Sequence, residues 1–145
     1  MDSRDNGNLL FVVTGACLKA ERLDRPLAER IRQAAHTALV ERIDSEPDIV
    51  ILSDIWYLNS TELHQTPTIS VGGPGVNHLS AYWQSRLPFA LMVENVLQIQ
   101  MDVSGADHRC CVWGMDHELT VEAVETFLSK GHLTRFLSLF PKTIK

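Results

Sequence analysis

Two short runs of apolar residues set the strongest limit on what this chain can fold into. The segments LLFVVTG, residues 9–15, and DIVILSD, residues 48–54, are rich in β-branched side chains and have few polar positions inside the run. A strand with one face in water alternates apolar and polar residues, whereas a continuous apolar run is typical of a strand covered on both faces. We therefore expect two buried strands in a sheet that helices cover on both sides.

Segments with helical spacing separate these runs from further strands. Apolar residues from about Pro26 to Ile43 recur every three or four positions, which predicts a helix with one buried face. The segment TISV, residues 68–71, predicts a third strand, and a short helix capped by Asn77 follows it. RCCVWG, residues 109–114, predicts another strand. A last helix is expected to begin with a cap at Thr120 and to end before Gly131.

The alternation of strands and helices predicts the fold class. Right-handed crossover connections would produce an α/β fold, an open three-layer sandwich with a mainly parallel sheet of four to six strands and helices on both faces. The element order is Rossmann-like or flavodoxin-like. The length of 145 residues predicts a single domain over residues 1–145, with a polar N-terminal tail at residues 1–8.

One segment breaks the pattern of fully apolar strands. In LQIQMDV, residues 97–103, apolar residues alternate with Gln98, Gln100 and Asp102. This alternation predicts a strand with one polar face, either at the edge of the sheet or in a hairpin around residues 96–103 that bends near Glu94. We expect the three polar side chains to be exposed there, or to contribute to an interface between subunits.

Composition excludes several classes of partner. The chain has 18 acidic and 13 basic side chains, a net charge of -5, and no dense cluster of Lys and Arg, so we do not expect a nucleic-acid partner. No apolar run approaches the roughly 20 residues that span a bilayer, so no membrane segment is expected. The polar start resembles no secretion signal, and three cysteines are an odd number, which together predict a cytoplasmic protein with reduced thiols.

The predicted fold indicates where a site would lie. In an open α/β sheet, ligands bind beyond the carboxyl ends of the strands. The candidate ligand-binding residues at these ends are Thr14, Gly15, Gly72, Gly73, Gly75, Asn77 and His78. The candidate acid and base residues are Asp54, Asp116 and His117. The pattern favours a structural role for the last two, in which Asp116 begins the turn into a helix capped at Thr120 and His117 faces solvent.

The segment VGGPGVNH, residues 71–78, leaves two interpretations open. A glycine-rich approach to a helix N-terminus can hold a phosphate or carboxylate through backbone N–H groups. The loop lacks the lysine of a P-loop, and His78 stands where a dinucleotide fingerprint has its third glycine. The same glycines and Pro74 are also what a tight turn between a strand and a helix requires.

No motif identifies a metal, a cofactor or a family. His108, Cys110, Cys111 and His117 do not have the spacing of paired zinc ligands, so no metal site is expected, and no cofactor is indicated. The element order is similar to that of response-regulator receivers and flavodoxin-like domains. The receiver's paired acids are absent at Thr14 and Gly15, however, and a flavin phosphate loop is absent as well.

These observations lead to two functional hypotheses. The first is a binding module, either ligand-sensing or for protein interaction, that associates with itself as a homo-oligomer and has no recognisable catalytic set. The alternative is an enzyme acting on a small anionic substrate held at the Gly72 to Gly75 loop, with proton transfer by Asp54, Asp116 or His117. Whether the protein is an enzyme stays open on the sequence.

Overall fold

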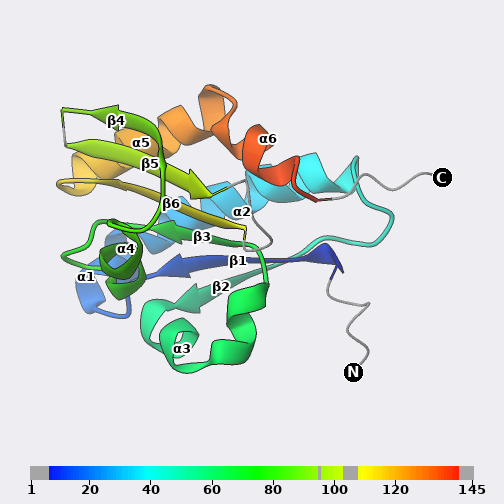
Figure 1. Ribbon diagram of the computed structural model, residues 1–145, viewed down its shortest axis with the longest axis horizontal. Helices are drawn as coiled ribbons and strands as arrows, with labels where there is room; N and C mark the ends of the chain where they lie inside the picture. The colour runs from blue at the N-terminus through cyan, green and yellow to red at the C-terminus, as the bar shows by residue number, and fades with distance from the viewer. Residues whose placement is uncertain (1–6, 95, 103–107, 141–145) are drawn as a thin grey trace.

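The computed structural model describes residues 7–94, 96–102 and 108–140 (Figure 1). The elements in chain order are β1 (Leu9–Thr14), α1 (Leu18–Leu23), α2 (Arg25–Val40), β2 (Asp48–Ser53), α3 (Asp54–Asn59), the 3-10 helix η2 (Thr61–Gln65), β3 (Thr68–Val71), α4 (His78–Trp83), β4 (Phe89–Val93), β5 (Leu97–Asp102), β6 (Arg109–Gly114), α5 (His117–Ser129) and α6 (His132–Leu137). Most of the predicted N-terminal tail, residues 1–6, lies outside the described residues.

The described strands form one six-stranded sheet in the order β2-β1-β3-β6-β5-β4. Neighbours among β2, β1, β3 and β6 pair in parallel, whereas β5 pairs antiparallel with both β6 and β4. The predicted α/β class and the number of strands are confirmed. The prediction of a mainly parallel sheet needs correction, because the sheet is mixed. Short connections join β4 to β5 and β5 to β6, and such connections permit only antiparallel pairing.

The predicted edge strand is not at the edge. A hairpin does form, with Glu94 in the left-handed region at its bend, but β4 is the outer strand and β5 lies between β4 and β6. Gln98 and Gln100 are buried, contrary to our expectation. The Nε2 group of Gln100 donates to the carbonyl oxygens of Gln84 at 2.8 Å and Leu87 at 3.1 Å. Gln100 therefore binds the loop after α4, whereas Asp102 pairs with Arg109. Residue 103 is outside the described residues.

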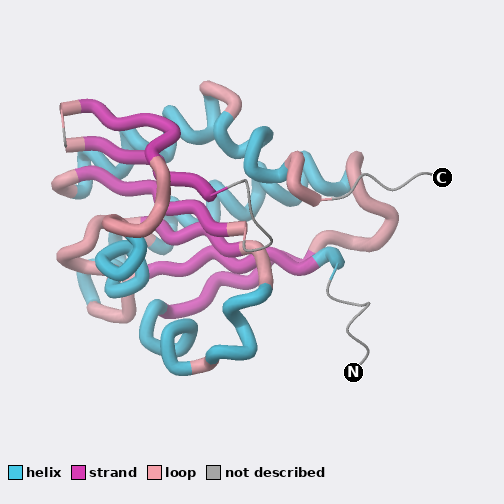
Figure 2. Tube along the Cα trace, viewed as in Figure 1, coloured by secondary structure: helices cyan, strands magenta, loops and turns pink. Residues whose placement is uncertain are grey.

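Helices lie against both faces of the sheet, as Figure 2 shows by colour. On one face, α2, α5 and α6 cover a core that includes Val12, Ile69 and Val112. On the other face, α3 and α4 cover a second core that includes Val13 and Trp113. Successive residues of β1 and β6 alternate between the two cores. This arrangement confirms the expectation that the continuous apolar runs are strands covered on both sides.

Predictions from the sequence were least accurate at the ends of helices. The helix α2 has Pro26 in its first turn as expected, but it ends at Val40, before Ile43. The predicted cap of the last helix at Thr120 is wrong. Asp116 caps α5 by accepting a hydrogen bond from Leu119 N at 2.9 Å, and Thr120 lies inside the helix. The short helix α1, directly after β1, had no apolar stripe by which to predict it.

Candidate functional site

The carboxyl ends of β1, β2, β3 and β6 point to the same edge of the sheet, because these four neighbours are parallel. This edge carries the β1–α1 connection, the start of α3, the Gly72–Asn77 loop before α4 and the start of α5 (Figure 1). The position is the one at which open α/β sheets bind ligands. The candidate residues proposed from the sequence all lie along it, but they fall into two separate groups.

The first group surrounds the carboxylate of Asp54, which is fully buried. Its Oδ1 accepts from the backbone N–H groups of Ala16 at 3.0 Å and Ile55 at 2.7 Å. Its Oδ2 accepts from the backbone N–H of His78 at 2.7 Å and from the ring Nδ1 of the same residue at 3.0 Å. One carboxylate thus satisfies N–H groups at the starts of α1, α3 and α4, where a bound anion would otherwise be favourable.

Asn77 and Gly15 complete this structural group. The Asn77 Oδ1 atom caps α4 by accepting from Leu79 N at 2.9 Å and Ser80 N at 3.1 Å. Its Nδ2 donates to the carbonyl oxygens of Val13 and Val71, so the whole amide is used within the protein. Gly15 allows β1 to approach the glycine-rich loop, since a Cβ built on it would lie 1.8 Å from the Val76 carbonyl oxygen.

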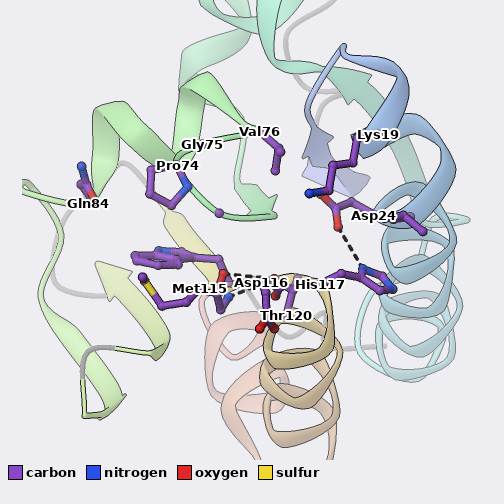
Figure 3. Close-up of a pocket in the computed structure, with 14 residues that line it drawn as sticks. Lys19, Asp24, Pro74, Gly75, Val76, Gln84, Met115, Asp116, His117 and Thr120 are labelled. Carbon is purple, nitrogen blue, oxygen red and sulfur yellow. Dashed lines mark hydrogen bonds and ion pairs between the residues drawn. The ribbon is translucent and has the colours of Figure 1, made fainter.

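The second group lines a pocket of about 360 Å³ on the other side of the glycine-rich loop (Figure 3). Three walls enclose it: α1, the loop at residues 73–76 and the start of α5, with Gln84 at a fourth side. Its lining comprises Lys19, Leu23, Asp24, Gly73, Pro74, Gly75, Val76, Gln84, Trp113, Gly114, Met115, Asp116, His117 and Thr120. This volume is within the range of small-ligand sites.

Ionisable side chains gather at the α1 side of this pocket. Asp24 Oδ1 lies 3.7 Å from His117 Nδ1, an ion-pair distance that is too long for a hydrogen bond. Figure 3 shows the side chain of Lys19 next to the Asp24 carboxylate. Burial raises the pKa of Asp24, and the nearby His117 and Lys19 lower it by less, so the net shift is upward. The protein therefore keeps a carboxyl where its charged form is costly.

Two buried nitrogen atoms in the pocket lining are without a hydrogen-bond partner in the described part of the chain. These are Nε1 of Trp113 and Nδ1 of His117. Buried donors and acceptors are nearly always satisfied in proteins, so unpaired ones call for a water, ion or ligand. The rest of the lining is largely apolar, with Leu23, Pro74 and Met115 facing the same space.

The structure separates the predicted site residues accordingly. Gly73, Gly75, Asp116 and His117 line the pocket, although Asp116 is also the cap of α5. Thr14, Gly15, Asp54, Gly72, Asn77 and His78 do not line it. Gly72 has a φ of 112°, and its N–H donates to Val112 O, so it serves the turn between strand and helix.

Sequence reasoning missed Lys19, Leu23 and Asp24. Lys19 and Leu23 belong to α1, a helix too short to produce an apolar periodicity, and Asp24 is the residue that follows it. The signal that was available is the pair of charged residues soon after the carboxyl end of the first strand. Trp113 was predicted only as part of the strand at residues 109–114.

Metal and membrane sites receive no support from this structure. Within residues 7–94, 96–102 and 108–140, there is no group of three or more His, Cys, Asp or Glu side chains that could hold a metal ion. The same residues contain no helix that is both long enough and apolar enough to span a bilayer.

Comparison with known proteins adds no family. No protein-family model matches this chain, and a search of curated proteins found no significant match either. The candidate site is therefore defined by its geometry alone.

Proposed function

We propose that this chain is a binding module whose small-molecule ligand occupies the pocket between α1, the residue 73–76 loop and the start of α5. The observation that supports this function is the pocket itself, about 360 Å³ in volume, at the carboxyl edge of four parallel strands. A buried carboxyl with a raised pKa in its lining is a second support. Proteins seldom retain such a group where it contributes nothing, because it costs stability.

A ligand screen with a blocked variant tests this proposal. A chemically diverse library is added to the full chain, and melting temperature is measured, since a ligand at 100 times its Kd adds about 2.7 kcal/mol. The variant Gly75→Phe places a large side chain on a residue of the pocket lining and should abolish the shifts. The backbone should tolerate it, because a Cβ at this position meets no atom within 4 Å. Val40→Phe, at an exposed position on α2, is the matched control. The proposal would be refuted if the melting-temperature shifts persisted in Gly75→Phe. It would also be refuted if no compound shifted the melting temperature of the wild type or of either variant.

A second candidate function is proton transfer on a bound substrate. The pair formed by Asp24 and His117 favours it, since a carboxyl and an imidazole at 3.7 Å can exchange roles as acid and base. The anionic substrate expected from the sequence has less support. Its N–H donors at the start of α4 are bonded to Asp54 and Asn77. If the protein is an enzyme, His117→Gln should still bind the substrate but should no longer convert it. If it is a binding module, no turnover should be seen in the wild type.

Self-association belongs to the same proposal and concerns a different surface. The outer strand β4 carries no charged residue, and Phe89, Met92 and Val93 on it are exposed. An uncharged apolar edge strand is a surface on which a second copy of the chain can pair. Size-exclusion chromatography with light scattering should show a dimer that Met92→Lys dissociates. A strict monomer at micromolar concentration would contradict this part of the proposal.

A further inference from the structure

We infer that the ligand of this pocket is a small organic cation, an amidine or amine on an apolar body, anchored by the carboxylate of Asp24. This inference rests on the proposed binding function and names its ligand class. It differs from the anionic ligand that the glycine-rich loop suggests, and three features of the pocket carry it.

The first feature is that the N–H donors at the start of α4, and several of those in the glycine-rich loop, are already used. The first three N–H groups of α4, from His78 to Ser80, donate to the side chains of Asp54 and Asn77. In the glycine-rich loop, the N–H of Gly72 donates to Val112 O, and those of Val76 and Asn77 donate to Gly73 O. A phosphate or carboxylate at this loop would have to break several of these bonds. The loop is thus a wall of the pocket and a poor anion receptor.

The second feature is the charge of the lining. Two carboxylates, those of Asp24 and Asp116, line the pocket together with one ammonium group, that of Lys19, and the imidazole of His117. Lys19 is on the exposed side of α1, whereas Asp24 is buried. A charge in a less hydrated place interacts more strongly than one in water, so the carboxylate dominates inside the pocket. The pocket therefore attracts a cation and repels an anion.

The third feature is the incomplete pairing of Asp24. Its Oδ1 is 3.7 Å from His117 Nδ1, beyond hydrogen-bond distance, and that nitrogen is without a partner among the described residues. The other oxygen, Oδ2, packs against Gly72, where an added Cβ would lie 2.6 Å from it. A charged N–H donor of an amidinium or ammonium group would make a strong hydrogen bond to Oδ1. The apolar side chains of Leu23, Pro74 and Met115 then contact the body of the ligand. The cationic end of such a molecule would therefore contact Asp24, and its apolar end would contact these three side chains.

Three compounds that share one ring and differ in charge test the inference on the full chain. Benzamidine is a cation, benzyl alcohol is neutral, and benzoate is an anion. We expect benzamidine to raise the melting temperature and to bind in calorimetry with a Kd at least tenfold lower than that of benzyl alcohol. Benzoate should give no measurable binding. Lys19→Ala, which removes the competing cation, should tighten benzamidine binding several-fold.

Asp24→Asn should weaken benzamidine binding at least tenfold. Asp48→Asn, at an exposed carboxylate at the opposite end of β2, should leave it unchanged. Benzoate binding as tightly as benzamidine, or equal effects of Asp24→Asn and Asp48→Asn, would overturn the inference while leaving a binding function in place. Failure of all three compounds would overturn it as well. The library screen with Gly75→Phe then decides separately whether the pocket binds any ligand.

Discussion

Asp54 and His78, which are 24 residues apart, are joined by two hydrogen bonds to a single carboxylate oxygen, from the backbone N–H at 2.7 Å and from ring Nδ1 at 3.0 Å. The carboxylate is fully buried, whereas the side chain of His78 is 73% exposed. With the bonds from Ala16 and Ile55, this contact connects the ends of β1, β2 and β3. The loops that shape the pocket are therefore fixed by an internal anion.

Replacing Asp54 should destabilise the protein strongly. The variant Asp54→Asn keeps the volume but presents an NH₂ group where two or more N–H donors point, so buried donors lose their acceptor. We expect a loss of about 2–4 kcal/mol in the free energy of unfolding. Urea denaturation measures it, with Asp48→Asn as the control that should change stability by less than about 0.5 kcal/mol. Equal stability of the two variants would show that Asp54 does not organise the loops.

Replacement by alanine should have very different effects on stability at Gly15 and at Gly75. Gly15→Ala places its Cβ on the Val76 carbonyl oxygen, and since both are backbone-fixed, we expect a loss of about 3 kcal/mol. Gly75→Ala meets no atom within 4 Å and restricts the unfolded chain, so it should change stability by less than about 1 kcal/mol. Thermal denaturation of the pair checks this. Comparable losses in both would mean that the close approach at Gly15 does not exist in solution.

The stability of the protein should depend on the ionisation of Asp24. Because burial raises the pKa of this carboxyl, the folded state binds its proton more tightly than the unfolded state does. The ionised group therefore lowers stability at neutral pH, and this cost disappears as the pH falls through the raised pKa toward the ordinary aspartate value. We expect Asp24→Asn to melt at a higher temperature than the wild type at pH 7, with the difference shrinking in acid. A lower melting temperature at pH 7 would contradict the prediction.

The three cysteines should differ sharply in reactivity. Cys17 is exposed, whereas Cys110 and Cys111 are buried in the two separate cores. Burial raises the pKa of Cys111 to about 12 and that of Cys110 well above the ordinary thiol value. A thiol reagent at pH 8 should thus titrate one group in the native protein and three in urea, since the thiolate is the reactive form. Cys17→Ser should abolish the native signal, and rapid modification of two or three native thiols would disprove the burial of the vicinal pair.

Much of the architecture was predictable because local pattern and burial agree. The runs at residues 9–15 and 48–54 were predicted as strands covered on both faces and form β1 and β2, and the spacing after Pro26 predicted α2. Asn77 as a cap and Gly131 in the left-handed region were predictable for the same reason, because helix caps depend only on the few residues at the helix end. The prediction failed for β5, where an alternating pattern indicated solvent but Gln98 and Gln100 are buried and Gln100 binds two loop carbonyls.

The sequence by itself determined which segments would be strands and helices, and on which edge of a parallel arrangement their loops would lie. Only the tertiary structure decided which of those loop residues face a pocket and which hold the loops together. Asp54 directly follows β2 and Asp24 lies between α1 and α2, but the residues around each do not reveal which other segments surround the carboxylate. The carboxylate of Asp54 is surrounded by N–H donors near three helix starts, while that of Asp24 is buried with its Oδ1 3.7 Å from His117 Nδ1, because contacts between segments distant in the chain fix the surroundings of each carboxylate.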